Sequence, residues 1–193
     1  MKLSNFWKPL VILSATAAGG AMAADPQVDM KTNVGTIRLE LYPAKAPKTV
    51  ENFLQYVKDG HFNGTIFHRV IDNFMIQGGG FDKSYKQKAT RASVENEGKN
   101  GLKNDLGTIA MARTSAPHSA SSQFFINGKN NDFLNAANAQ DGWGYTVFGK
   151  VVSGMDVVTK ISKSPTGSGG PFPTDVPREM VVIESVTLVT DKK

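Results

Sequence analysis

The sequence predicts a mainly β protein, a closed eight-stranded antiparallel barrel capped by two α-helices. Short segments rich in β-branched and aromatic residues recur along the chain, and turn-forming residues separate them. Only two segments have the apolar spacing of a helix, and they do not alternate with strands as a parallel sheet would require. Such strands close most readily into an antiparallel barrel.

The N-terminus has the composition of a cleavable signal peptide. Lys2 and Lys8 supply positive charge, and the apolar run around Leu10–Leu13 is too short to span a bilayer. Ala21–Ala23 matches the small-residue pattern of a cleavage site. We therefore expect residues 1–23 to be removed, the exported chain to begin at Ala24, and no stable insertion into the membrane.

Residues 24–193 are expected to form a single domain, since a chain of this length can build one hydrophobic core. The chain has no cysteine, which suits an oxidising compartment because nothing can mispair. The formal net charge of +5 is mild, and the lysines are scattered, so we expect no nucleic-acid partner. Without a heptad repeat or a long exposed apolar stripe, the expected state is a monomer.

The first elements in chain order are a hairpin and a helix. The hairpin joins Gln27–Thr32 to Gly35–Tyr42, in which apolar and polar residues alternate. The helix has Pro47 in its first turn and ends at Gly60. One face carries apolar residues at i, i+3, i+4 and i+7, and we expect this face to cover one end of the core. These residues are Val50, Phe53, Leu54 and Val57.

The remaining strands are shorter and are joined by two long connections. An Asp-Asn turn joins the next two strands, which are predicted at Thr65–Ile71 and Phe74–Gln77. Further strands are predicted at Leu106–Arg113, Ser122–Asn127, Thr146–Val152 and Glu179–Thr190, and a second helix at Met155–Ile161. The connections are Asp82–Asp105, expected to be anchored around Glu95–Glu97, and Ser164–Pro177, a Gly/Pro/Ser loop.

Arg69 is the charged residue that stands out. Strand alternation would place Phe67, Arg69 and Ile71 on one face, so a permanent cation would share a surface with apolar groups. Such a surface suits a ligand that is apolar with one polar position. The following strand adds apolar area and one amide, from Phe74, Met75 and Gln77.

Conventional catalytic and metal-binding patterns are missing from the sequence. His61, His68 and His118 lack metal-ligand spacing, and there is no Gly-x-Ser-x-Gly motif. Gly78–Gly80 lacks the spacing of a dinucleotide-binding loop, and backbone crowding explains these glycines better. No cofactor or metal is implied. A reaction that breaks no covalent bond would leave such an inventory empty.

The segment Phe67–Phe81, which contains Phe-His-Arg-Val-Ile and Phe-Met-Ile-Gln-Gly, resembles the signature of the cyclophilins, the peptidyl-prolyl cis–trans isomerases. Ser122–Ile126 (Ser-Gln-Phe-Phe-Ile) and Val147–Val151 (Val-Phe-Gly-Lys-Val) match two further motifs, and the resemblance extends from Gln27 to Val189. It implies a cyclophilin-type barrel that isomerises X–Pro bonds. With the leader, it is similar to the bacterial periplasmic members, which implies a periplasmic enzyme acting on proline-containing segments of unfolded or partly folded exported proteins.

The resemblance also assigns roles to individual residues. Arg69 matches the catalytic arginine that donates to the prolyl nitrogen. Phe74 and Gln77 complete the implied catalytic set, as a wall of the proline pocket and as the amide that holds the substrate backbone. The implied substrate-binding residues are Met75, Ala112, Arg113, Gln123, Phe125, Phe133, Leu134 and Tyr145.

Four positions depart from the family pattern. Arg113 replaces the usual asparagine, and Phe133 stands where eukaryotic members carry tryptophan. Tyr145 replaces a histidine, so the rate should depend little on pH between about 6 and 8. Gly80 replaces an aspartate, which we expect to alter a turn and not the chemistry.

A binding module or chaperone that captures prolyl peptides without isomerising them is the alternative from another class. The combination of Arg69 with Gln77 counts against it, because capture alone needs no donor at the prolyl nitrogen. A secreted hydrolase has no supporting motif.

Overall fold

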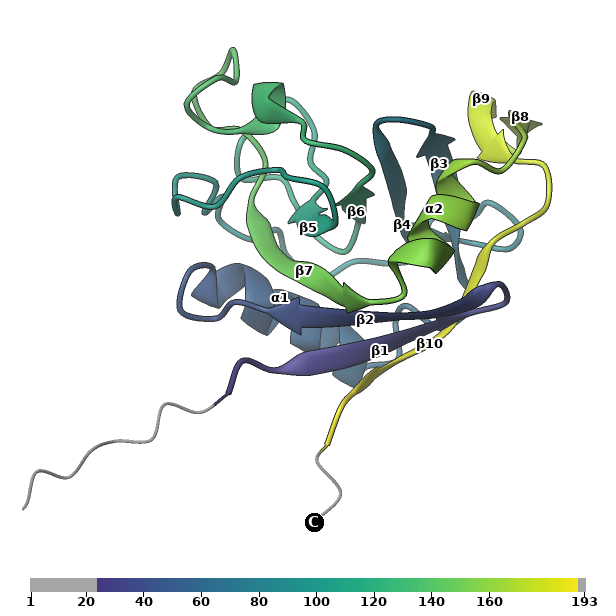
Figure 1. Ribbon diagram of the computed structural model, residues 1–193, viewed down its shortest axis with the longest axis horizontal. Helices are drawn as coiled ribbons and strands as arrows, with labels where there is room; N and C mark the ends of the chain where they lie inside the picture. Colours follow the sequence, from purple (N-terminus) through teal and green to yellow (C-terminus); the bar gives the residue numbers. More distant parts are fainter. Residues whose placement is uncertain (1–23, 191–193) are drawn as a thin grey trace, which may run out of the picture.

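Eight antiparallel strands close into a barrel in the computed structural model of the chain, which describes residues 24–190 (Figure 1). Their order around the barrel is β1-β10-β3-β4-β6-β5-β7-β2. The predicted barrel is confirmed, whereas the predicted leader lies outside the described residues. The strands are β1 Gln27–Thr32, β2 Gly35–Leu41, β3 Thr65–Ile71, β4 Met75–Asp82, β5 Thr108–Met111, β6 Phe124–Asn127, β7 Val147–Ser153 and β10 Val182–Leu188.

Two α-helices pack against the barrel, as predicted: α1 (Pro47–Lys58) and α2 (Met155–Ser162). A single 3-10 turn, η1, spans Asp132–Leu134. Phe53 of α1 is buried with its ring 5.0 Å from that of Phe62 and 5.2 Å from that of Phe148. Fully burying a side chain of this size contributes roughly 1.5–3 kcal/mol, so the apolar face of α1 supplies much of its stability.

The long connection between β4 and β5 is anchored by the helix it passes. The Glu97 carboxylate accepts hydrogen bonds from the backbone N–H of Thr49 (2.9 Å) and from its hydroxyl (2.7 Å), at the start of α1. Ala46, at the N-cap, makes no capping bond with its side chain. A carboxylate from a distant segment therefore satisfies a free N–H of the first turn. The anchor expected around Glu95–Glu97 is found.

The Gly/Pro/Ser segment predicted as a loop at Ser164–Pro177 forms a small hairpin instead. Its strands, β8 (Thr166–Gly169) and β9 (Phe172–Pro177), pair antiparallel and lie beside β3 (Figure 1). Phe172 supplies the reason, because its ring packs edge-on against Phe81 at 5.0 Å. Packing against the barrel outweighs the poor strand propensity of glycine and proline.

The expected alternation along β3 is also wrong. Phe67 pairs with Gly78 whereas Arg69 pairs with Gln77, so two steps along β3 match one step along β4. This β-bulge places Phe67 in the main core, 1% exposed, and turns Arg69 outward. The two side chains do not share a face.

The glycines of β4 reflect crowding, as the sequence indicated. A Cβ on Gly79, whose φ is +86°, would lie 2.8 Å from the Phe124 ring, and one on Gly78 would lie 3.0 Å from the Ile66 carbonyl oxygen. The absence of side chains here lets β4 approach its neighbours closely.

His68 is buried beside this hairpin. Its ring lies 4.6 Å from that of Phe81 and 5.2 Å from that of Phe172, and burial lowers its pKa to about 4. The unfolded chain takes up a proton near pH 6.5, but the folded protein does not until about pH 4.

We expect the free energy of unfolding to fall as the pH drops from 6.5 to 4, with His68 contributing up to about 3 kcal/mol of the loss. His68→Phe should flatten this dependence because the buried group no longer titrates. Urea unfolding at several pH values measures the effect. A variant with the same slope as the wild type would contradict this assignment.

Candidate active site

A small hollow of about 120 Å³ lies where β4, β6 and β5 run side by side, on the face of these strands that points away from the main core. Ligand pockets for drug-sized molecules measure about 300–1,000 Å³, so this hollow suits one small side chain of a longer ligand. Nine of the predicted site residues line it: Arg69, Phe74, Met75, Gln77, Ala112, Arg113, Phe125, Leu134 and Tyr145.

The floor of the hollow is apolar and belongs to a second core cluster. Met75, Phe125 and Leu134 are each less than a tenth exposed. The Tyr145 ring packs edge-on against Phe125 with their centroids 5.6 Å apart. Because these side chains are packed into the core, the hollow is rigid before any ligand arrives.

Arg69 lies beside this floor, and its guanidinium is exposed to solvent. It lies opposite Gln77 on β4, which in turn lies opposite Phe125 on β6. Three neighbouring strands therefore place a cation, an amide and an aromatic floor in one row.

Two contacts orient the Arg69 guanidinium. Nη1 donates to Oε1 of Gln77 at 3.5 Å, and Nε lies 3.9 Å from Oδ2 of Asp175 on β9. Neither contact uses Nη2, which is bonded to none of the described residues and can donate to a ligand. Asp175 could not be recognised from the sequence, because the strand that carries it has the composition of a loop.

The two predicted residues that do not line the hollow lie at its edge. Phe133 is 56% exposed, and its ring stacks on Phe74 with centroids 5.7 Å apart. Gln123 accepts a 3.0 Å hydrogen bond from Nε2 of Gln77 and so extends the polar side of the site.

Gly80 has a different role from the one expected. It lies within β4 and not in a turn, and a Cβ there would lie 2.5 Å from Cγ of Gln123 and 2.7 Å from its Cδ. The glycine therefore makes room for the Gln123 side chain that bonds Gln77.

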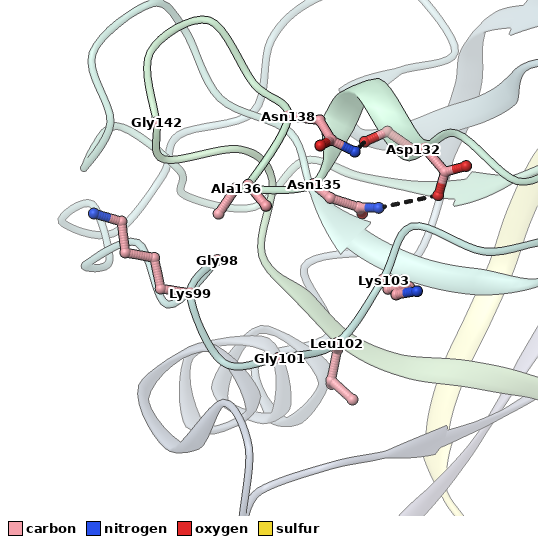
Figure 2. A pocket seen from close by; sticks show the side chains of 11 residues that line it. Gly98, Lys99, Gly101, Leu102, Lys103, Asp132, Asn135, Ala136, Asn138 and Gly142 are labelled. Carbon is pink, nitrogen blue, oxygen red and sulfur yellow. Dashed lines mark hydrogen bonds between the residues drawn. The ribbon is translucent and has the colours of Figure 1, made fainter.

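A larger cavity, about 600 Å³, lies elsewhere, between the segments 98–103 and 132–142 (Figure 2). Its wall consists largely of backbone and short side chains, braced by a 3.3 Å hydrogen bond from Asn135 to the Asp132 carboxylate. None of the predicted site residues lines it. Size alone does not identify the functional site of this chain.

Within residues 24–190, no helix has the length and apolar character needed to cross a membrane. The same part of the chain has no group of three or more His, Asp or Glu side chains placed to hold a metal ion.

The antiparallel barrel and its partly apolar hollow, which two arginines line, can be compared with known families. Residues 27–188 match the family described as cyclophilin type peptidyl-prolyl cis-trans isomerase/CLD. The chain therefore belongs to the cyclophilin family, and it is a peptidyl-prolyl cis–trans isomerase. The enzyme interpretation of the sequence is confirmed.

Individual relatives support the assignment of the chain to this family. Peptidyl-prolyl cis-trans isomerase B of Escherichia coli is 57% identical over 162 residues, which cover 83% of this chain and 98% of the relative. Peptidyl-prolyl cis-trans isomerase A of Dickeya dadantii is 50% identical, covering 93% and 94%. A Cryptosporidium parvum cyclophilin, whose crystal structure was obtained in the presence of the dipeptide Ala-Pro, is 27% identical with a TM-score of 0.72, covering 86% of this chain and 99% of that structure.

Gly80→Ala is expected to raise KM for a prolyl peptide about 3- to 10-fold, since its Cβ displaces Gln123 and breaks the bond to Gln77, an effect of about 1 kcal/mol. Steady-state kinetics measure this. Gly167→Ala in β8 is the matched control, because a Cβ there meets no atom closer than 3.7 Å. An unchanged KM in Gly80→Ala would show that the Gln77–Gln123 pair does not contribute.

We expect kcat/KM to stay within about twofold between pH 6 and 8, because no histidine, aspartate or glutamate lines the hollow. Tyr145→His should introduce a titration near pH 6.5. A clear titration in the wild type would show that a group outside the hollow takes part.

Proposed function

We propose that the enzyme isomerises X–Pro bonds in exported proteins by presenting Arg69 to the prolyl nitrogen while the proline ring occupies the apolar hollow. The observation that carries this is the row formed by Arg69, Gln77 and Phe125 across β3, β4 and β6. It places a cation with a free N–H directly beside the hollow, which has the size of one small side chain.

The barrier to be lowered is amide resonance, about 18–20 kcal/mol. In the planar bond the nitrogen lone pair is shared with the carbonyl, whereas in the twisted bond it is free to accept a hydrogen bond. A donor at the nitrogen therefore stabilises the transition state more than the ground state. Lowering the barrier by about 7 kcal/mol accelerates the reaction roughly 10⁵-fold, within the reach of a charge-assisted hydrogen bond in a preorganised site.

The other residues hold the substrate while the bond turns. In this proposal the proline ring packs against Met75, Phe125 and Leu134, and Gln77 makes a hydrogen bond to the peptide backbone. The chain before proline lies along the backbone that leaves β5 at Ala112–Arg113, where the small Ala112 side chain leaves room for it.

The composition of the N-terminus supports the proposed substrates and location. A predicted cleavable leader, together with a chain that lacks cysteine, supports a periplasmic enzyme that acts on unfolded or partly folded exported proteins. The mild charge supports peptide partners over nucleic acid, and we propose that the enzyme works as a monomer without stable membrane insertion.

Arg69→Ala should lower kcat/KM at least 100-fold in a protease-coupled assay with a prolyl peptide, because the donor at the nitrogen is lost. The kcat/KM of Arg69→Lys should lie between those of the wild type and Arg69→Ala, since lysine keeps the charge but not the planar guanidinium.

Arg38→Ala is the matched control, because this arginine of β2 is paired with Asp29 on β1 and lies outside the hollow. Unchanged turnover in a folded Arg69→Ala variant would contradict the proposed mechanism, although the chain would remain an isomerase of another kind.

A further inference from the structure

Arg113 is held in an unusual way for an arginine at the edge of a binding site. Its side chain is only 5% exposed. Nε donates to the Gly144 carbonyl at 2.9 Å, Nη1 donates to the Thr114 carbonyl at 3.0 Å, and Nη2 pairs with Oδ2 of Asp141. Asp141 is its only ion-pair partner among residues 24–190, so this carboxylate alone balances a nearly buried charge.

The guanidinium also covers one wall of the hollow. Its Cζ lies 4.7 Å above the centre of the Tyr145 ring, which also packs edge-on against Phe125. Arg113, Tyr145 and Phe125 thus form three successive layers, and all three line the hollow. A cation over an aromatic ring is attractive, and most so where water is excluded.

Asp141 serves the same wall from the loop that leads into it. Its Oδ1 accepts hydrogen bonds from the backbone N–H of Trp143 (2.9 Å) and of Gly144 (3.2 Å), just before Tyr145. These bonds and the Arg113 guanidinium lower the pKa of Asp141 to about 2. One oxygen therefore shapes the turn before Tyr145, and the other holds the cation that covers Tyr145.

We propose that Asp141 is a positioning residue that acts through Arg113 to hold Tyr145 against Phe125, and so sets the width of the hollow for the proline ring. The proposal rests on the proposed function of this hollow. A nearly buried guanidinium that loses its counter-charge moves toward water, and the layer over Tyr145 is lost with it.

The expected kinetic effect follows because this wall contacts the proline ring and not the bond that rotates. A wall that grips the ring does so equally in the planar and the twisted state of the bond, so its loss weakens both states alike. Removing such uniform binding raises KM and leaves kcat unchanged. Loss of the Arg69 donor acts on the transition state and lowers kcat, so the two roles are distinguishable.

The test is Asp141→Asn, which keeps an oxygen for the N–H groups of Trp143 and Gly144 and puts an amide NH2 in place of the carboxylate oxygen facing Arg113. Both the counter-charge of Arg113 and the acceptor for its Nη2 are then lost. We expect KM for a prolyl peptide to rise about 5- to 20-fold while kcat stays within twofold. Asp29→Asn is the matched control, because it removes the carboxylate of another ion pair, with Arg38, outside the hollow. It should leave both constants unchanged.

A second measurement separates positioning from general damage to the fold. In the background of Arg113→Asn, adding Asp141→Asn should change KM by less than twofold, because Asp141 then has nothing to hold. An unchanged KM in Asp141→Asn, a fall in kcat, or additive effects in the double variant would each overturn the proposal.

NMR titration in the Arg69→Ala background tests the same positioning role without turnover. It measures the dissociation constant of the peptide. A 5- to 20-fold increase on adding Asp141→Asn supports the positioning role even if Arg69 proves not to be the donor. No increase would overturn it.

Discussion

The outward position of Arg69 depends on the β-bulge in β3. Without it, Arg69 would follow the same alternation as Phe67 and would face the core, where an unpaired guanidinium is costly to bury. With it, Phe67 fills the core and Arg69 emerges opposite Gln77, at the rim of the apolar hollow. A local irregularity of one residue thus allows a stable core and a charged site to share one strand.

The rest of the site is arranged around this cation by residues that restrain it without neutralising it fully. Oδ2 of Asp175, on the β8–β9 hairpin, lies 3.9 Å from Nε, and Gln77 accepts a hydrogen bond from Nη1. Gln77 is itself held by Gln123, for which Gly80 leaves space. The polar side of the hollow is therefore a connected series of side chains, whereas its apolar side belongs to a second hydrophobic cluster, separate from the main core.

Much of this could be predicted from the sequence, because its signals are local. The spacing of Val50, Phe53 and Val57 predicts α1. Arg69, Met75, Gln77 and Phe125 fall in short motifs on the adjacent strands β3, β4 and β6. What could not be predicted depends on distant contacts. The bulge at Phe67 follows from packing, and the β8–β9 hairpin forms because Phe172 finds a ring to pack against.

A structure of the enzyme with bound Ala-Pro dipeptide would show whether the hollow holds the proline ring and whether Arg69 reaches the prolyl nitrogen. We expect the proline ring to lie on the floor formed by Met75, Phe125 and Leu134, with an Arg69 guanidinium nitrogen within about 3.5 Å of the prolyl nitrogen, the reach of a hydrogen bond. A dipeptide bound in the larger cavity between segments 98–103 and 132–142, or bound in the hollow with Arg69 turned away, would contradict this expectation.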